Sequence, residues 1–326
     1  MADPERGNQT SIIGFILLGF GNFHELQILL SLLFLVIYVV TMAGNMAIVV
    51  LVVADQHLHT PMYFFLGNLS CLEACYTSTI LPRMLASLLS GDKTISFAGC
   101  LIQFYMFGSL ISTECCLLSA MSYDRYLAIC KPLHYSARMN SGFSLQLAAG
   151  SWLSGFAAGT IAACWVSQQI FCGPNEIDHF FCDYTPLIKL SCSDTSRLVL
   201  VVFLSCCIFI LPPFLLTLTS YMCIISAILR IPSSTGRQKA FSTCSSHLIV
   251  VTVFYGTLII VYMLPDMAAL RDLNKVFSVF YTMLTPMVNP LIYSLRNQEV
   301  RKALRKALSK TVTSMSICKR FGGHLL

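Results

Sequence analysis

Seven long stretches that are almost free of charge constrain the fold of this chain more than any other feature. Five of them contain no Asp, Glu, Lys or Arg: 28–54, 139–175, 198–229, 240–265 and 276–295. The other two, 60–82 and 94–123, contain one carboxylate each, Glu73 and Glu114. A helix needs about 20 mostly apolar residues to cross a bilayer. Each stretch is therefore long enough to span a membrane once.

The chemistry of a bilayer selects helices for these stretches. Inside lipid every backbone N–H and C=O must be paired within a helix or a closed barrel, and barrel strands are only about 10 residues long and alternate in polarity. Composition agrees, because 11% of the residues are charged against about 25% in soluble domains. We predict an all-α membrane protein, a bundle of seven transmembrane helices within 26–295. The expected helices are 26–53, 60–83, 96–130, 141–166, 198–229, 238–264 and 272–295.

Lys and Arg are distributed unevenly over the expected loops. If the N-terminal segment 1–25 lies outside, the outer segments carry seven of these residues and the inner segments carry fourteen. Basic residues concentrate in cytoplasmic loops, so we expect a plasma-membrane protein with an extracellular N-terminus and a cytoplasmic tail, 296–326. Asn8 begins an N-glycosylation acceptor tripeptide, which agrees with this orientation. The net charge of +6 then faces anionic membrane lipid rather than nucleic acid.

The third stretch ends in a charged pair, Asp124 and Arg125, followed by Tyr126. Arg125 comes 25 residues after Cys100, which corresponds to roughly 37 Å of helix and a full crossing. Taken alone, such a pair is also typical of side chains that snorkel to an interface. The run 121–130 as a whole is similar to the helix-three signature of olfactory receptors, a form of the Asp-Arg-Tyr motif of rhodopsin-like G-protein-coupled receptors.

Further motifs occur in the order in which that family has them. They are Gly44-Asn45, the run 58–66, Ser220-Tyr221, the run 239–247 and the run 286–297. Together they extend over nearly the whole chain, and the chain resembles the tetrapod-type (class II) olfactory receptors. It departs from the usual family residues at Ser122, where Ala is common, and at Glu73, where Asp is common.

The resemblance implies a ligand pocket in the outer half of the bundle. The residues expected there by family position are Phe107, Gly108, Ile111, Ser112, Ser205, Phe209, Tyr255, Ile259 and Tyr262. This set is apolar with a few hydroxyl groups, which suits a small volatile odorant with one hydrogen-bonding group. Ordinary packing in the bundle core is the alternative interpretation of each residue. Phe107 stands where amine receptors carry an acidic residue, which argues against an amine neurotransmitter as ligand.

The resemblance also implies a coupling surface for a heterotrimeric G protein of the olfactory stimulatory type, which raises cyclic AMP. The residues expected to take part in activation are Asp124, Arg125, Tyr126, Tyr221, Asn289, Pro290 and Tyr293. Arg125 would be held by Asp124 at rest and released when the sixth helix moves. The base of that helix contains Arg237 and Lys239 but no acid, so an ionic latch from Arg125 to the sixth helix is not expected.

Glu73 and Glu114 are carboxylates deep within the expected membrane region, where ionisable groups are costly. By family position they should face each other near Asn45 and Asn289. Two adjacent carboxylates do not ionise together unless a cation or a proton lies between them. The residues leave two possibilities open: a site for one Na⁺ or shared proton, and a neutral hydrogen-bonded pair.

Four of the 15 cysteines lie at or beyond the expected outer boundary: Cys100, Cys172, Cys182 and Cys192. Four cysteines permit three pairings. We hypothesise that Cys100 pairs with Cys182, which would hold the second outer loop across the mouth of the bundle, and that Cys172 pairs with Cys192.

The segment after the seventh stretch has helical periodicity. Apolar residues recur at positions 300, 303, 304, 307 and 308, and Lys and Arg occupy the opposite face. This pattern predicts a short amphipathic eighth helix that lies on the inner leaflet. A solvated helix in the tail is the alternative.

A membrane transporter or channel is the main rival to the receptor interpretation. Transporters often show internal repeats and several buried charges, whereas this sequence has no evident repeat and two buried acids. It also has no zinc-ligand pattern, nucleophile elbow or phosphate-binding loop. We therefore expect no enzymatic activity, and no cofactor apart from the possible Na⁺.

Overall fold

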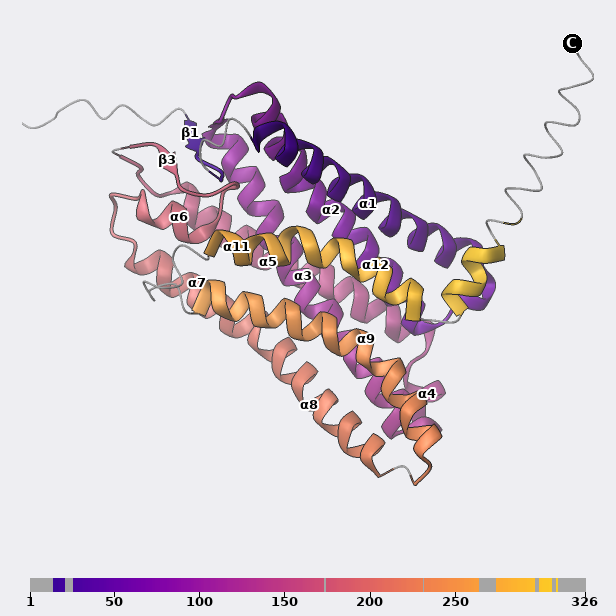
Figure 1. Ribbon diagram of the computed structural model, residues 1–326. Coiled ribbons are helices and arrows are strands. Elements are labelled where there is room, and N and C mark those ends of the chain that lie inside the picture. Colours follow the sequence, from indigo (N-terminus) through magenta and orange to yellow (C-terminus); the bar gives the residue numbers. More distant parts are fainter. Residues whose placement is uncertain are drawn as a thin grey trace, which may run out of the picture.

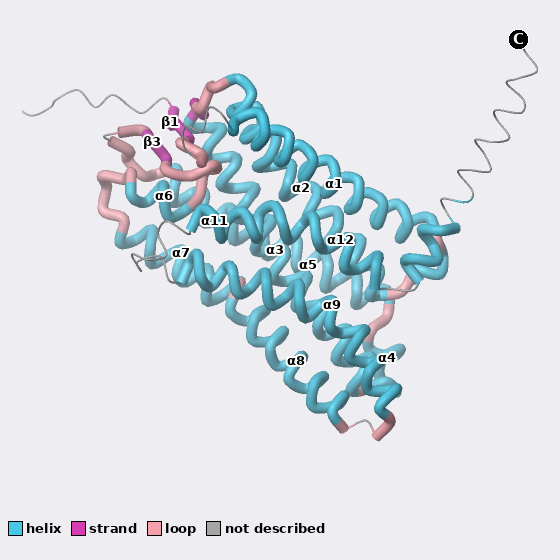
Figure 2. Tube along the Cα trace, in the orientation of Figure 1, coloured by secondary structure: helices cyan, strands magenta, loops and turns pink. Residues whose placement is uncertain are grey.

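The structure is a computed structural model that describes residues 14–20, 26–172, 174–230, 232–263, 274–296, 299–306 and 309. Long helices lie side by side in one bundle, and the short strands gather at one end of it (Figures 1 and 2). The first half of the chain forms α1 (Gln27–Ala54), η2 (Gln56–Leu58), α2 (Pro61–Ser90), α3 (Phe97–Cys130), α4 (Pro132–Arg138) and α5 (Ser141–Ser167). The second half forms α6 (Tyr184–Lys189), α7 (Ser196–Phe209), α8 (Leu211–Leu229), α9 (Ser234–Leu258), η3 (Ile259–Met263), α11 (Asn274–Val279), η4 (Phe280–Leu284) and α12 (Thr285–Arg296).

The outer surface of the bundle is strongly apolar. Ile28 of α1 and Leu153 of α5 are 74% and 73% exposed, a surface that water does not tolerate over a large area but lipid does. Within the described residues, four helical segments are long and apolar enough to cross a membrane: α1, α3, α5 and the stretch Ser196–Leu229 that α7 and α8 form together. The fold is therefore that of a mostly helical membrane protein.

Helix α3 is the central element, and its approach to α5 is very close. It buries residues around most of its circumference, from Cys100 to Leu127. A Cβ atom at Gly155 of α5 would lie 2.0 Å from Oγ1 of Thr113, and one at Gly159 would lie 2.0 Å from Oγ of Ser109. Glycine at these two positions lets the two backbones touch, as small residues do in membrane helix pairs.

The last three expected helices are not regular throughout. The expected helix 198–229 is divided at Ile210, between α7 and α8. Pro212 and Pro213 follow this break, because proline lacks an N–H and fits only the first turn of a helix. α9 continues into the π-helical turn η3, and the π-helical turn η4 separates α11 from α12. Such turns change the faces that later residues present.

A small sheet lies at one end of the bundle and was not part of the all-α prediction. Its strands are β1 (Gly14–Leu17), β2 (Thr94–Ser96) and β3 (Glu176–Ile177), in the order β2-β1-β3. β1 pairs antiparallel with β2 and parallel with β3. We call this end of the bundle the disulfide end, because Cys100 and Cys182 are buried beside the sheet, and the opposite end of α3 the Arg125 end.

Candidate ligand and activation sites

The α3 residues of the predicted ligand site face the interior of the bundle. Phe107, Ile111 and Ser112 are buried, and the Ser112 hydroxyl donates to the Gly108 carbonyl at 2.9 Å. A Cβ atom at Gly108 would meet no atom within 4 Å. The α3 face is therefore tightly enclosed at Phe107 and opens onto unfilled space at Gly108.

The predicted residues of the sixth helix do not share one environment. The buried Tyr255 donates its hydroxyl to the Cys115 carbonyl at 3.1 Å, and Tyr262 hydrogen bonds at the disulfide end. Ile259, in contrast, is 37% exposed. Ile259 is the first residue of the π-helical turn η3, and its exposure separates it from the buried Tyr255 among the residues predicted for the ligand site.

The two predicted residues of α7 are half-buried. Ser205 donates its hydroxyl to the Val201 carbonyl at 2.8 Å, within its own helix. The thiol of Cys116 in α3 lies 3.9 Å from the Phe209 carbonyl. α7 thus meets α3 near the level of Phe209, one turn below Ser205.

A series of hydrogen bonds lies beneath the loop between α5 and α7, at the disulfide end. We call this loop the second loop. The Tyr262 hydroxyl donates to Oδ1 of Asp183 at 2.9 Å and lies 3.2 Å from the Tyr281 hydroxyl. Tyr281 donates to Ser278 at 3.3 Å, and Nε2 of His179 lies 3.3 Å from the same Ser278 oxygen. These groups link the second loop to η3, which continues α9, and to α11 and η4.

The two loop residues of this series, Asp183 and His179, are buried and have altered acidities. Burial raises the pKa of the Asp183 carboxyl from 3.8 to about 6, although hydrogen bonds from the Tyr184 N–H and the Tyr262 hydroxyl oppose the rise. Burial, together with the charge of Lys275, lowers the pKa of His179 to about 3. At neutral pH the imidazole is therefore uncharged and does not act as a counter-ion for Asp183.

Aromatic rings surround Phe107 below this series of hydrogen bonds. The Phe107 ring centroid lies 4.7 Å from Phe181, 5.5 Å from Tyr76 and 6.2 Å from Tyr281. These three residues and Asp183 are not among those predicted for the ligand site from the sequence. Phe181 and Asp183 flank Cys182, so the hypothesised disulfide to Cys100 was the signal that could have placed both over the bundle mouth.

Both hypothesised disulfides are present in the structure. Cys100 bonds to Cys182 with a Cα–Cα distance of 5.5 Å, and Cys172 bonds to Cys192 with 5.9 Å. The Cys182 N–H also donates to Oε1 of Gln103 in α3 at 3.0 Å. The loop segment 179–183 is therefore attached to α3 by a covalent bond and a hydrogen bond, next to the aromatic group around Phe107.

Two cavities are described in the structure, and they lie elsewhere. One of about 160 Å³ lies at the disulfide end between β1, α1 and α2. The other, of about 430 Å³, lies at the Arg125 end between α3 and α4. None of the predicted ligand-binding residues lines either of them.

Glu73 and Glu114 are both 1% exposed and lie close enough to interact electrostatically. Asn289 donates to Oε1 of Glu73. Within the described residues, Oε2 of Glu73, Oε1 of Glu114 and Oδ1 of Asn45 are buried without a hydrogen-bond partner. Unsatisfied carboxylate and amide oxygens are hard donors that fit a small cation or a proton. No group of three or more His, Cys, Asp or Glu side chains that could hold a metal occurs in the described part of the chain.

At the Arg125 end, Asp124 is fully buried and holds two partners. Nε of Arg125 donates to Oδ2 of Asp124 at 3.0 Å, and Nη2 binds the same oxygen. The Tyr135 hydroxyl of α4 donates to Oδ1 of Asp124 at 2.9 Å. The half-buried Tyr126 stacks on Tyr123 with ring centroids 6.3 Å apart. The arginine is thus paired with its neighbouring acid, which also anchors α4.

Tyr221 of α8 hydrogen bonds to Nδ1 of His247 in α9, and both side chains are buried. Arg125 lies near enough to act on His247 electrostatically. Pro290 of α12 packs on α1, since a Cβ atom at Gly44 would lie 3.1 Å from Cβ of Pro290. The side chain of Tyr293 and all of Asn8 lie outside the described residues.

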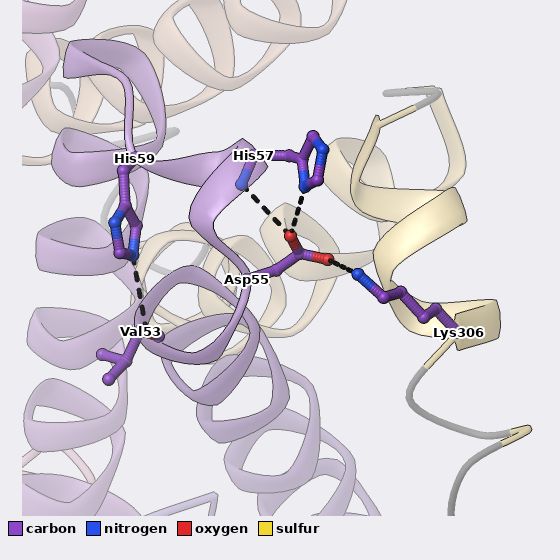
Figure 3. Close-up of polar contacts among 5 residues, drawn as sticks. All are labelled: Val53, Asp55, His57, His59 and Lys306. Carbon is purple, nitrogen blue, oxygen red and sulfur yellow. Dashed lines mark hydrogen bonds and ion pairs between the residues drawn. The ribbon is translucent and has the colours of Figure 1, made fainter.

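The segment 299–306 is helical and docks on the bundle at its Arg125 end. Val300 and Ala303 are buried among Ile48, Leu51 and Leu58, so these two apolar residues contact protein, whereas the sequence pattern had suggested a lipid surface. Figure 3 shows the polar side of the contact: Asp55 accepts from Nδ1 of His57 at 2.9 Å and from Nζ of Lys306 at 3.5 Å. The hydrogen bonds from His57 lower the pKa of Asp55 to about 2.

The fold and these two sites define a class: a helical membrane protein whose central helix connects a roofed, aromatic-lined region at one end to a buried Asp–Arg pair at the other. Comparisons with known proteins identify the family. The family model described as "Olfactory receptor" matches residues 34–311. The chain is 50% identical to human Olfactory receptor 10A7 over 94% of its own length and 96% of that protein. It is 51% identical to human Olfactory receptor 6F1, over 92% and 97% of the two chains, and 48% identical to mouse Olfactory receptor 5M5, over 95% and 97%.

The chain belongs to the olfactory receptor family. Members of this family are multi-pass plasma-membrane receptors for odorants that couple to G proteins, and they are not enzymes.

Proposed function

We propose that the chain is an odorant receptor that binds small volatile molecules beneath the second loop, at the disulfide end, and activates a stimulatory olfactory-type G protein from its Arg125 end. The observation that supports this most is the construction of α3. It carries Phe107 within the aromatic group and, 18 residues later, the paired Asp124 and Arg125. Phe107 and Arg125 are roughly 27 Å apart along this one helix.

Signalling then proceeds by a shift between two packings of the bundle. A ligand among Phe107, Ser112 and Tyr262 favours the packing in which the sixth helix moves away at the Arg125 end. The hydrogen bond between Tyr221 and His247 joins α8 to α9 at this end. Its rearrangement frees Arg125 to bind the G protein. Cyclic AMP rises as a result.

The test is cyclic AMP accumulation in cells that express the chain with an olfactory stimulatory G protein, across a panel of volatile odorants. Arg125→Ala is expected to abolish a dose-dependent response at unchanged surface expression. Arg197→Ala, an exposed arginine at the disulfide end, is the matched control and should respond like wild type. Ligand-gated ion flux without any G protein would instead favour a channel.

The membrane topology that goes with this function has seven spans, an extracellular N-terminus and an eighth helix on the inner side. The supporting observation is the excess of Lys and Arg in the segments assigned to the cytoplasm. Glycosidase treatment of the protein from mammalian cells should increase its gel mobility, and Asn8→Gln should abolish the shift. Wild-type protein that is insensitive to the enzyme would contradict an extracellular Asn8.

We propose further that Glu73 and Glu114 hold one Na⁺ or share one proton at rest. Their unpartnered oxygens and that of Asn45 support this assignment. Replacing Glu114 with Gln is expected to change the sodium dependence or the basal level of cyclic AMP signalling, because the amide cannot neutralise a cation or exchange a proton. An identical sodium response and basal level in Glu114→Gln would contradict both versions.

A further inference from the structure

The cavity of about 160 Å³ at the disulfide end has the size and lining of a small-molecule site. An apolar cavity of about 150 Å³ holds a molecule as large as benzene. Apolar side chains form most of the wall, among them Leu18 of the N-terminal segment, Leu30 of α1, and Met84 and Leu88 of α2. The apolar part of a short ligand would therefore be enclosed on three sides by different segments of the chain.

Two basic side chains, Arg83 and Lys93, line the same cavity. Arg83 is half-buried, and within the described residues its guanidinium makes no hydrogen bond or ion pair. The exposed Asp92 lies near enough for an electrostatic interaction with Arg83. Its carboxylate accepts hydrogen bonds from N and Oγ1 of Thr94 instead, at 2.9 and 2.7 Å. A guanidinium offers five N–H donors in a planar fork that matches a carboxylate. Its position in an apolar wall therefore favours an anionic ligand.

An aromatic partition separates this cavity from the proposed odorant site. Phe20 and Phe180 line the cavity and stack with ring centroids 5.2 Å apart. On its other side Phe180 contacts Phe181 at 5.1 Å, and Phe181 packs on Phe107 at 4.7 Å. The cavity thus lies one aromatic layer away from the proposed odorant site.

We propose that this cavity binds a short-chain carboxylate, with its carboxylate on Arg83 and its alkyl chain against Leu30, Met84 and Leu88. The volume admits a single short chain, since butanoate has as many non-hydrogen atoms as benzene, and excludes the two acyl chains of a phospholipid. The site does not depend on the proposed odorant response, because its lining and its charge are separate from the predicted ligand residues.

The experiment measures equilibrium binding of labelled butanoate to the purified full-length protein in nanodiscs of phosphatidylcholine. Saturable binding is expected, and Arg83→Gln should weaken it by about 10-fold or more, because hydrogen bonds to a charged group are lost. Arg83→Lys should weaken it less, because lysine keeps the charge without the fork. Ser87→Trp, which fills the cavity from α2, should abolish binding.

Arg197→Gln is the matched control and should bind butanoate like wild type, and 1-butanol should fail to compete because it lacks the charge. Absence of saturable binding to the wild type would overturn the proposal, as would undiminished binding to Arg83→Gln or Ser87→Trp. If Arg83→Gln does not fold, Arg83→Lys and Ser87→Trp decide the question. Nanodiscs that contain phosphatidylglycerol should leave the affinity unchanged. Loss of butanoate binding in them would assign Arg83 to a lipid headgroup and overturn the proposal.

Discussion

At the scale of single residues, Asp183 combines burial with the lack of a neutralising charge. It follows Cys182 directly, is 1% exposed, and receives its two hydrogen bonds on one oxygen. His179 in the same loop is neutral near pH 7, because burial lowers its pKa to about 3. The position of the carboxylate is therefore fixed by the disulfide and by Tyr262, at a cost in electrostatic energy.

This cost predicts a measurable dependence of stability on pH. The pKa of Asp183 is raised from 3.8 to about 6 in the folded state, so between these values the folded state binds more protons than the unfolded state. Stability from this group is therefore highest below about pH 4 and falls by roughly 3 kcal/mol in all as the pH rises from there past 6, with about half of the fall between pH 5 and pH 7. Asp183→Asn should lose this fall, so that its thermal unfolding midpoint gains on wild type between pH 5 and pH 7.

The comparison is a difference between two proteins, so the other titrating groups, including His179, cancel. Parallel midpoint curves for wild type and Asp183→Asn would show that Asp183 is not buried as described. Asp194→Asn alters an exposed acid of the same loop and serves as the control, with a curve expected to run parallel to wild type.

At the scale of elements, the contact between α3 and α5 depends on Gly155 and Gly159, where a larger side chain does not fit. A Cβ atom at Gly155 would lie 2.6 Å from the Ser109 carbonyl oxygen and 2.7 Å from the Thr113 nitrogen. These neighbours are backbone atoms, which cannot turn away. Gly108, on α3 itself, has open space instead, so packing does not require glycine at that position.

Substitution of Gly155 and substitution of Gly108 should therefore have different consequences. Gly155→Val is expected to force α5 away from α3 at a cost of about 1–3 kcal/mol or more, visible as a lower unfolding midpoint and reduced surface expression. Gly108→Val should keep normal surface expression but fill the space beside Phe107, so that the odorant response falls. Normal expression of Gly155→Val would contradict the close approach of the two helices.

At the scale of the whole molecule, two disulfides hold the loop between α5 and α7 over one end of the bundle. The Cys100–Cys182 bond closes a separation of 82 residues and the Cys172–Cys192 bond one of 20. In the chain-entropy model the longer closure restricts the unfolded chain more. The first bond also joins the loop to α3, whereas the second lies within the loop.

Removal of the two bonds should therefore differ in effect. The Cys100→Ser, Cys182→Ser double variant is expected to lose about 1 kcal/mol more stability than the Cys172→Ser, Cys192→Ser double variant. It should also lose the odorant response, because the loop segment with Phe181 is no longer held over Phe107. Thermal unfolding of the two purified variants measures the first difference. Equal midpoints together with equal odorant responses would contradict the assigned roles.

The long uncharged stretches determined the helical membrane fold, because a bilayer leaves the backbone few alternatives. The family motifs carried the identification, and the family match extends over 34–311. The sequence also supplied the pairing of Cys100 with Cys182 as a hypothesis, and Asp124 beside Arg125 as a pair. All of these follow from composition, from local spacing, or from resemblance to a family.

Only the tertiary structure decided which distant residues meet. The hydrogen bonds that run from Asp183 through Tyr262 to Tyr281 join a loop to two helices, and no local pattern encodes these contacts. The exposure of Ile259 and the π-helical turn that begins there were likewise visible only in the structure, since both depend on how the whole helix packs. The unpartnered Arg83 in an apolar wall became visible in the same way: a charge within an expected helix is ordinary in sequence, and only the enclosing segments make it a site.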